Sequence, residues 1–259
     1  MTITYAVPDL HGQLDALRDA LAQIDLSNPS SRLVFLGDYI DRGPDSAGVL
    51  TEVRRLHDAY PGQVVALLGN HETWWLDWLD GDDEDASWLL ADRSFETTRS
   101  FVPADVFEQA AAELVAAIGR GSIDAGVAAR VNAEIKREVR ARHRDLITWL
   151  RARPPYYETE THLYVHAGVD EDAGYMWKSM TPGRMLTEKY PPSLGPNLVG
   201  RIIVAGHVGV GPLHADAGRM RCWDPYVDPG HIYLDGGVEQ TGQLNVMRYD
   251  STIGATTFL

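Results

Sequence analysis

Short apolar runs that end at polar loops recur along the chain of 259 residues. Each run is a few residues long and apolar at nearly every position, a pattern typical of strands that are covered on both faces. The runs predict strands at 3–7, 32–36, 63–68, 162–166, 201–205, 231–234 and 243–249.

Between these runs, apolar residues return at helical spacing. The stretches 14–24 and 46–60 each carry one apolar stripe and predict helices. The segment 104–151 is rich in Ala, Glu and Arg and predicts two helices that break near 119–122. Strands that alternate with helices predict an α/β fold. We interpret 104–151 as a helical insertion packed on the sheet, rather than as a lid that faces a substrate.

Composition supports one domain and narrows the range of partners. Hydrophobic residues make up 44% of the chain, enough for a substantial core, and we expect a single domain over 1–259. The formal net charge of −14 disfavours nucleic acid and acidic membranes as partners, because Lys and Arg recognise both. A small phosphate compound stays compatible, since metal cations can invert the local field. The oligomeric state is left open.

Cysteine content and the N-terminal residues bear on the compartment. The single cysteine, Cys222, excludes an intrachain disulfide and a cysteine-based zinc site. The N-terminal residues lack the basic and apolar regions of a signal peptide, and no apolar run is long enough to span a bilayer. These features fit a reducing cytoplasm, which is the location that we expect.

Metal-ligand side chains follow the apolar runs where the loops begin. Because the carboxyl ends of neighbouring strands are where α/β proteins place their chemistry, we expect these side chains to meet at one edge. Two divalent cations about 3.5–4 Å apart can clamp the oxygens of a phosphoryl transfer, and they need a bridging anion. Mixed Asp, His and Asn ligands suit Mn²⁺, Fe or Zn²⁺. The candidate ligands are Asp9, His11, Asp38, Asn70, His166 and His207.

Five ordered motifs carry a resemblance to a known family. They read PDLHG at 8–12, GDYIDRG at 37–43, GNHE at 69–72, HAG at 166–168 and GH at 206–207. The chain resembles the phosphoprotein phosphatase branch of the calcineurin-like metallophosphoesterases. The resemblance implies a four-layer α/β/β/α sandwich with the metals at the carboxyl ends of the strands.

The resemblance also implies an assignment of ligands to two divalent metal ions, for which we expect Mn²⁺, with Fe or Zn²⁺ as alternatives. We expect Asp38 to bridge the two ions. The first ion would take Asp9, His11 and Asp38, and the second would take Asp38, Asn70, His166 and His207.

Catalytic roles follow from the same resemblance. A bridging hydroxide would attack phosphorus, and His71 would protonate the leaving oxygen. Asp41 would hold the other nitrogen of His71 and keep the ring charged and oriented. Arg42 would present a two-donor fork to the phosphate, which Asn70 and His71 would also contact.

Two features depart from the family pattern. Pro8 stands where the family has glycine, which fixes φ and removes a backbone donor, so we expect a slightly shifted loop that keeps its metal. The second phosphate-binding arginine of the family has no clear match. Lys178, after Trp177, and Arg184 are the candidates for its role, although a lysine is a point charge and not a fork.

The motif residues leave three hypotheses for the function of the protein. The first is a serine/threonine phosphoprotein phosphatase, and the second is a hydrolase of dinucleoside polyphosphates such as diadenosine tetraphosphate, or of related nucleotides. The third is a metal- or phosphate-binding module without turnover, which Pro8 and the missing arginine suggest and which the intact His71, Asp41 and Arg42 oppose.

Two groups near the GNHE motif have alternative interpretations. Trp74, Trp75 and Trp78 are expected to pack in the core, with an aromatic wall for a nucleobase as the alternative. Glu72 is interpreted as an acid in the first turn of a helix, where the helix dipole favours it, with support of a metal ligand as the alternative.

Overall fold

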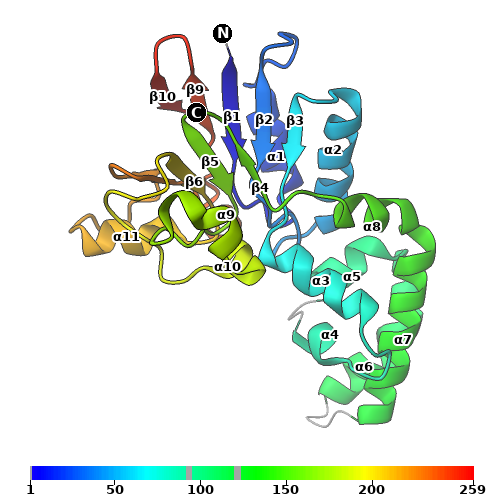
Figure 1. Cartoon of the computed structure of the whole chain (residues 1–259). Helices are drawn as coiled ribbons and strands as arrows, with labels where there is room; N and C mark the ends of the chain where they lie inside the picture. The colour runs from blue at the N-terminus through cyan, green and yellow to red at the C-terminus, as the bar shows by residue number, and fades with distance from the viewer. Residues whose placement is uncertain (1, 92–94, 120–123) are drawn as a thin grey trace.

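The computed structural model describes residues 2–91, 95–119 and 124–259. Two five-stranded sheets pack face to face, and a lobe of helices extends beside them (Figure 1). The first sheet has the order β10-β9-β1-β2-β3, in which β1, β2 and β3 are parallel. Its strands are β1 (Ile3–Val7), β2 (Arg32–Phe35), β3 (Val64–Ala66), β9 (Met247–Asp250) and β10 (Ala255–Phe258).

The second sheet has the order β4-β5-β6-β8-β7, with β5, β6 and β8 parallel. The second sheet therefore has antiparallel strands at both edges, whereas in the first sheet the antiparallel pairings lie on the β9 and β10 side and the edge strand β3 is parallel to β2. The strands of the second sheet are β4 (Tyr156–Glu158), β5 (His162–Val165), β6 (Ile202–Ala205), β7 (Tyr226–Val227) and β8 (His231–Tyr233).

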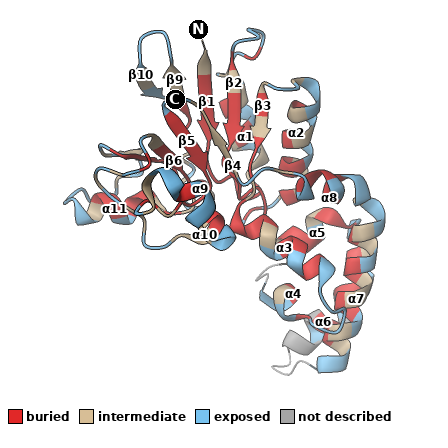
Figure 2. Cartoon of the chain, in the orientation of Figure 1, coloured by how far each residue is buried: buried red, intermediate tan, exposed pale blue. Residues whose placement is uncertain are grey.

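Side-chain alternation along the strands creates the layers. In β1, Tyr5 and Val7 face the helices on the outer side of the first sheet, whereas Ala6 faces the second sheet. In β5, Tyr164 faces the first sheet and Leu163 faces the helices beyond the second sheet. Because successive strand residues point to opposite faces, both sheets are buried on both sides, as Figure 2 shows for the central strands. The expected four-layer α/β/β/α sandwich is confirmed.

Helices form the two outer layers and the lobe. The first sheet is covered by α1 (Leu14–Leu21) and α2 (Ser46–Ala59). The second sheet is covered by α9 (Trp177–Met180), α10 (Gly183–Glu188) and α11 (Val210–Asp216). The lobe consists of α3 (Asn70–Asp80), α4 (Ser87–Ala91), α5 (Glu96–Phe101), α6 (Ala104–Gly119), α7 (Ala125–Arg142) and α8 (Arg144–Arg151). Two short helices remain, η1 (Gly174–Met176) and α12 (Val238–Thr241).

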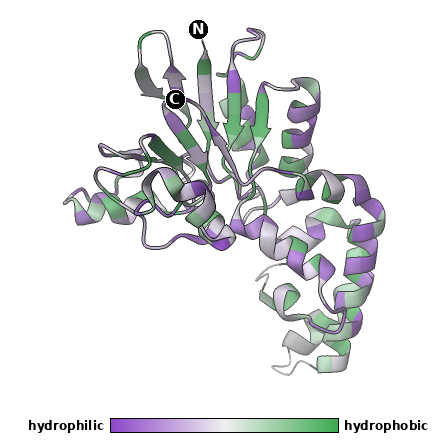
Figure 3. Cartoon of the chain, in the orientation of Figure 1, coloured by the Kyte–Doolittle hydropathy of each residue, from purple (hydrophilic) through white to green (hydrophobic). Residues whose placement is uncertain are grey.

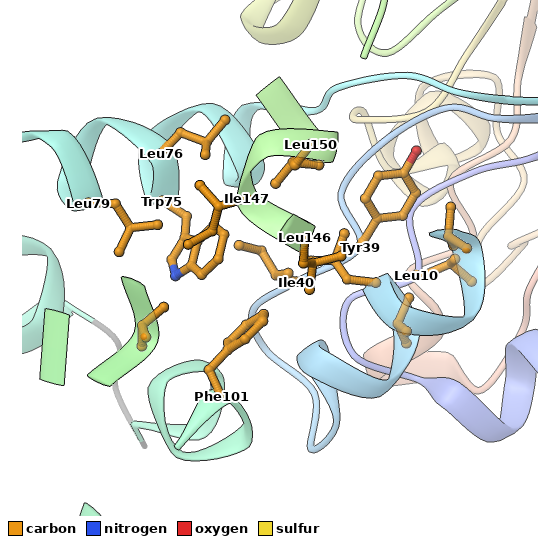
Figure 4. Close-up of a cluster of buried hydrophobic side chains, with 14 of the residues drawn as sticks. Leu10, Tyr39, Ile40, Trp75, Leu76, Leu79, Phe101, Leu146, Ile147 and Leu150 are labelled. Carbon is orange, nitrogen blue, oxygen red and sulfur yellow. The ribbon is translucent and has the colours of Figure 1, made fainter. Parts of the chain in front are cut away.

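The lobe shares one hydrophobic core with the first sheet. Figure 4 shows a cluster that runs from Leu10 and Tyr39, in the motif loops, to Trp75 and Phe101 in the lobe. The rings of Trp75 and Phe101 stack with centroids 4.8 Å apart. The PDLHG and GDYIDRG loops are therefore anchored by packing against the lobe.

The helices predicted within 104–151 are present as α6, α7 and α8. The lobe differs from the prediction in two ways: helical structure starts already at Asn70, and His143 separates α7 from α8. The predicted break at 119–122 agrees with the end of α6 at Gly119, while 120–122 lie outside the described residues. A single domain over 1–259 stays a prediction.

The seven predicted strands are right in place, and all but the one at 3–7, which coincides with β1, extend beyond the observed strand on at least one side. The predicted strand at 243–249 appears only as β9, and before β9 the side chain of Asn245 donates to the carbonyl oxygen of Leu234 instead of continuing the strand pattern. The edge strands β4, β7 and β10 were not predicted, because strands of two to four residues that lack a continuous apolar run give little signal. The predicted strands β2 and β3, by contrast, are hydrophobic over most of their length (Figure 3). Among the described residues, no helix combines the length and apolarity that crossing a membrane requires.

Candidate metal centre and active site

Five motif loops meet at the carboxyl edges of the two sheets. Residues that follow parallel strands emerge on the same side of a sheet, and the two edges are joined directly. Nδ1 of His166 lies 3.1 Å from the carbonyl oxygen of Leu36, and the backbone N–H of His207 donates to Oδ1 of Asp9 at 2.9 Å. Ligands from both sheets therefore belong to one cluster.

Left-handed backbone conformations gather in these loops. Among the described residues, seven residues other than glycine have positive φ, and five of them lie in the motifs. Such conformations are unfavourable for residues with a Cβ and persist where surrounding structure enforces them, often at functional sites. The five are His11 (φ 41°), Asp38 (53°), Asp41 (70°), Arg42 (65°) and His207 (62°).

Two groups of side chains can each hold a metal ion. The first contains His11, Asp38 and His71, and the second contains Asp38, His166 and His207. Within each group, the ligand atoms lie within 4.8 Å of one another. Asp38 belongs to both groups, which is the position that a bridging carboxylate requires.

The two remaining predicted ligands lie against the same groups. Oδ2 of Asp9 is 3.9 Å from Nε2 of His11. Oδ1 of Asn70 is 2.9 Å from both Nε2 of His166 and Nδ1 of His207. The structure thus brings together all six residues that the sequence suggested as ligands. His71, which the sequence suggested as an acid, also reaches the first group.

His11 is oriented as a metal ligand. Its Nδ1 lies 2.8 Å from the carbonyl oxygen of Ile40, an arrangement in which Nδ1–H donates and Nε2 carries the lone pair. Nε2 is buried and has no hydrogen-bond partner among the described residues. Since buried polar atoms are nearly always paired, this nitrogen is well suited to bind a cation.

In the cluster, burial and neighbouring charges shift the pKa values of the same side chains in opposite directions. Burial alone would raise the pKa of Asp38, but the charges of His166 and His71 hold that pKa well below its usual value. Burial would lower the pKa of His166, but Asp38 and Asp9 raise it to about 9. Burial lowers the pKa of His11 and His207 to about 4, so both rings are neutral at pH 7 and able to bind metal.

Two glycines make room for the carboxylates. A Cβ at Gly69 would lie 2.0 Å from Oδ1 of Asp38, and a Cβ at Gly206 would lie 2.1 Å from Oδ1 of Asp9. Neither contact is sterically allowed, so no larger residue fits either position without moving a predicted ligand. These glycines are the first residues of the GNHE and GH motifs.

His71 is paired with Asp41 as the motif resemblance implied. Nδ1 of His71 lies 2.6 Å from Oδ2 of Asp41, and Thr97 of α5 donates to the other oxygen of Asp41 at 2.6 Å. Burial would lower the pKa of His71, but Asp38 and Asp41 raise it. The Asp41 carboxylate therefore orients the ring and favours its protonated form, which can donate a proton from Nε2.

Arg42 lies beside His71 at the rim of the cluster. Its Nη2 is 3.4 Å from Nε2 of His71, and its Nη1 donates to Oε1 of Glu239 at 3.1 Å. The side chain of Arg42 is 47% exposed, so it borders both the cluster and solvent. A guanidinium in this place can meet a phosphate that reaches the cluster from outside.

A family model for calcineurin-like phosphoesterases matches residues 4–211 of the chain. The matched region contains all five motifs and the whole lobe. The chain belongs to the calcineurin-like phosphoesterase family. Members of this family are phosphoester hydrolases, and typically bind two divalent metals.

Individual relatives agree with the family assignment. A symmetrical bis(5'-nucleosyl)-tetraphosphatase from Janthinobacterium sp. (strain Marseille) is 30% identical over 167 residues, which cover 64% of this chain and 43% of that protein. The chain thus matches less than half the length of this curated relative. Its activity therefore bears on this chain only as a proposal.

Solved structures share the fold. The crystal structure of a protein described as a putative diadenosine tetraphosphatase superposes with a TM-score of 0.55 at 18% identity, over 100% of this chain and 93% of that chain. A protein serine/threonine phosphatase from Saccharomyces cerevisiae has a TM-score of 0.53 at 14% identity, over 100% and 79%. At such identities the likeness concerns the fold alone.

The residues present fit the two metals that the calcineurin-like phosphoesterase family typically binds. The fit rests on the unpaired Nε2 of His11, on the shared position of Asp38 and on the space left by the two glycines. Pro8 does not displace Asp9, whose carboxylate still contacts His11 and His207. The expected retention of this ligand agrees with the geometry.

Glu72 does more than favour the start of a helix. It lies in the first turn of α3, as interpreted, but its buried carboxylate accepts hydrogen bonds from the backbone N–H groups of Asp38, Tyr39 and Gly69 at 2.8, 2.8 and 3.0 Å. Burial, together with the charge of Asp38, raises its pKa to about 7. Glu72 therefore fastens the GDYIDRG loop to the GNHE loop and supports Asp38.

Lys178 and Arg184, the candidates for the second phosphate-binding cation, make none of the described contacts with the residues of the metal-centre cluster. Lys178 pairs with Glu158, which lies opposite Leu163 near the start of β5, whereas His166 follows the end of that strand. Arg184 is exposed on α10. A phosphate-binding role for either residue stays a prediction.

Of the three tryptophans, two pack in the core, and the third lies partly exposed beside the site. Trp75 and Trp78 are buried in the core, as expected. Trp74 is 43% exposed, and its ring centroid lies 5.0 Å from that of His71. Nε1 of Trp74 donates to Oε1 of Glu188 at 2.9 Å, which holds the ring beside the site.

Two site contacts were missed by sequence reasoning. Thr97 and Glu239 lie in short helices, far along the chain from Asp41 and Arg42, and no motif marks them. The only available signal for Glu239 was its place soon after a predicted strand end, which was weaker than the five motifs.

Proposed function

We propose that this protein is a metal-dependent hydrolase that cleaves phosphate esters or anhydrides at the shared edge of its two sheets. The observation that carries the proposal is the cluster of six candidate ligands around Asp38, with the buried, unpaired Nε2 of His11. Two divalent ions would be held there, with Mn²⁺ first and Fe or Zn²⁺ as alternatives. When bound, they would lower the pKa of water and stabilise phosphoryl charge.

In this proposal, one ion is held by Asp9, His11 and Asp38. The other ion is held by Asp38, Asn70, His166 and His207. Hydrogen bonds from the histidine rings to backbone carbonyls fix two of the rings in place. Such supporting contacts tune ligand basicity and geometry.

His71 would protonate the leaving oxygen. Its Nε2 faces Asp38 at 3.8 Å, while Asp41 holds Nδ1. Arg42 would bind the phosphoryl oxygens next to His71. We expect the acid to matter most for poor leaving groups, because these need protonation in the transition state.

For the substrate class, we propose a dinucleoside polyphosphate such as diadenosine tetraphosphate. Two observations support this choice over a phosphoprotein: the 30% identical relative is a symmetrical bis(5'-nucleosyl)-tetraphosphatase, and the exposed ring of Trp74 lies next to the proposed acid. An aromatic ring fixed at the leaving-group side can contact a ribose or a base. The second candidate is a serine/threonine phosphoprotein, which the motif resemblance favours.

A parallel assay tests the proposal. Metal-stripped protein is titrated with Mn²⁺ and supplied with diadenosine tetraphosphate, a phosphoserine peptide or p-nitrophenyl phosphate. We expect hydrolysis that requires the metal, is lost in Asp38→Asn, and is fastest on the dinucleotide. Faster turnover of the peptide would select the phosphoprotein candidate. Metal binding without hydrolysis of any of the three, also with Fe²⁺ or Zn²⁺, would favour the binding module.

A further inference from the structure

A carboxylate at the carboxyl edge of the second sheet touches the proposed phosphate-binding arginine. β8 is parallel to β6, and α12 follows it at the same edge as the HAG and GH loops. Glu239, in the first turn of α12, accepts from Nη1 of Arg42 at 3.1 Å. None of the six candidate ligands follows β8, but the helix after this strand contributes the acid Glu239.

The two partners of this ion pair are buried very unequally. The Glu239 side chain is 6% exposed, whereas that of Arg42 is 47% exposed. Oε2 of Glu239 is buried and has no hydrogen-bond partner within the described part of the chain. A carboxylate that is nearly enclosed and half paired is unfavourable in itself, which indicates that its fixed position has a use at the site.

Arg42 is difficult to position by its own backbone. It has φ of 65° in a loop, and its other contact, from Nη2 to Nε2 of His71, is long at 3.4 Å. A half-exposed arginine that lacks a firm partner samples many rotamers, and a phosphate that binds it must bear the cost of ordering. The ion pair with Glu239 orders the Arg42 side chain before phosphate binds. The pair engages Nη1, so Nε and Nη2 of the guanidinium can still donate to a phosphate.

We propose that Glu239 is a positioning residue, whose carboxylate holds Arg42 so that the guanidinium faces an incoming phosphoryl group. The proposal rests on the proposed role of Arg42 in phosphate binding. The opposite arrangement, in which Glu239 competes with phosphate for Arg42, predicts a change of opposite sign. Measurement of phosphate affinity therefore distinguishes the two.

The test measures the Kd of inorganic phosphate by calorimetry on Mn²⁺-loaded protein, beside KM and kcat. We expect Glu239→Ala to raise both the Kd and KM about three- to tenfold, with a smaller change in kcat. Glu239→Gln keeps an acceptor for Nη1 and should restore part of the affinity. In an Arg42→Ala background, Glu239→Ala should not weaken phosphate binding further.

A matched control is Glu138→Ala, because Glu138 pairs with Arg142 at 3.1 Å on α7, with side-chain exposures of 22% and 45%. The control should leave the phosphate Kd unchanged. A lowered or unchanged Kd in Glu239→Ala overturns the proposal, including the case in which only the melting temperature falls, as a role confined to α12 would give. An unchanged Kd in Arg42→Ala would instead show that the proposed role of Arg42 is wrong.

Discussion

Two buried clusters of histidine and carboxylate groups differ in how completely they are paired. In the metal-centre cluster, Nε2 of His11 lies 3.7 Å from Asp38 and has no hydrogen bond to any described residue. In the second cluster, His231 lies between Glu171 and Asp228, with 2.9 Å from a ring nitrogen to each carboxylate. Lys189 adds a further bond to Glu171 at 2.6 Å.

The difference separates a binding site from a structural network. The His231 network satisfies its own charges, and its members tie the segment before β6 to the start of β8. The metal-centre cluster leaves Nε2 of His11 without a partner among the described residues and sets the carboxylates of Asp9 and Asp38 against each other, and bound cations would relieve both. Burial and residue type alone would have classed the two clusters together.

The largest expected effect comes from removing the shared carboxylate. Asp38→Asn keeps the size of the side chain but removes the charge that both metal groups use, and we expect kcat/KM to fall by about three orders of magnitude. Mn²⁺ should raise the melting temperature of wild-type protein, because ligands that bind only the folded state stabilise it. The variant should lose most of that shift. A variant that keeps both activity and metal-dependent stabilisation would contradict the role of Asp38.

The next effect concerns His71. We expect His71→Asn to lower kcat about 10²- to 10⁴-fold on substrates with poor leaving groups, and distinctly less on p-nitrophenyl phosphate, whose leaving group needs little protonation. Thr97→Val, which removes the donor to Asp41, should show the same selectivity at smaller amplitude. Equal losses on both kinds of substrate would mean that His71 acts as a metal ligand, as its place in the first metal group would also allow.

Sequence reasoning reached the core of the site because its ligands follow apolar strands at short, ordered motifs. Asp38 and His166 are separated by well over a hundred residues and follow strands of different sheets, yet each comes within three residues of a strand end, and the carboxyl edges of the two sheets meet. The α/β class followed from the same strands and the helices between them, whereas the four-layer arrangement was implied by the family resemblance.

Contacts made by the short helices were beyond the reach of the pattern. Thr97 and Glu239 reach the site through tertiary packing of α5 and α12, which are too short to show a clear period. Glu72 was placed correctly in a helix turn, but its hydrogen bonds to another loop depend on how two loops meet. Pairing between distant polar groups has no periodic signal along the chain.

In the His231 network, a substitution should affect stability and spare catalysis. His231→Gln leaves Glu171 and Asp228 without the cation between them, and we expect unfolding to become easier by about 3 kcal/mol. The kcat per folded molecule should stay close to that of wild type. Denaturant titration and the assay on the same samples check both points. A loss of activity without a loss of stability would show that this network also serves the site.

The His231 network should also make the stability of the protein depend on pH. Burial would lower the pKa of His231, but Glu171 and Asp228 raise it, so its contribution is full below about pH 6.5 and is lost as pH rises through the folded pKa. Burial would raise the pKa of Glu171, but His231 and Lys189 lower it to about 2. Its contribution is full above about pH 4.5 and is lost as pH falls towards 2.

The titrations of His231 and Glu171 together predict that the network stabilises the fold most between about pH 4.5 and 6.5. After allowance for solvent screening, we expect about 2 kcal/mol to be lost on the acid side. The quantity to measure is the difference in unfolding free energy between wild type and His231→Gln across pH, in which the titration of the metal-centre cluster cancels. A difference that is flat with pH would contradict this charge assignment.

The smallest effect is expected at Lys178, which lies in neither cluster. Its ion pair with Glu158 is half exposed, so Lys178→Ala should change stability by less than about 1 kcal/mol. The more informative quantity is the phosphate Kd. If Lys178 supplies the second phosphate-binding charge, it must leave Glu158 when substrate arrives, and the variant should then bind phosphate more weakly, with an effect that fades at high salt. An unchanged Kd would withdraw this role and leave Arg42, held by Glu239, as the cation that the described contacts place against the site.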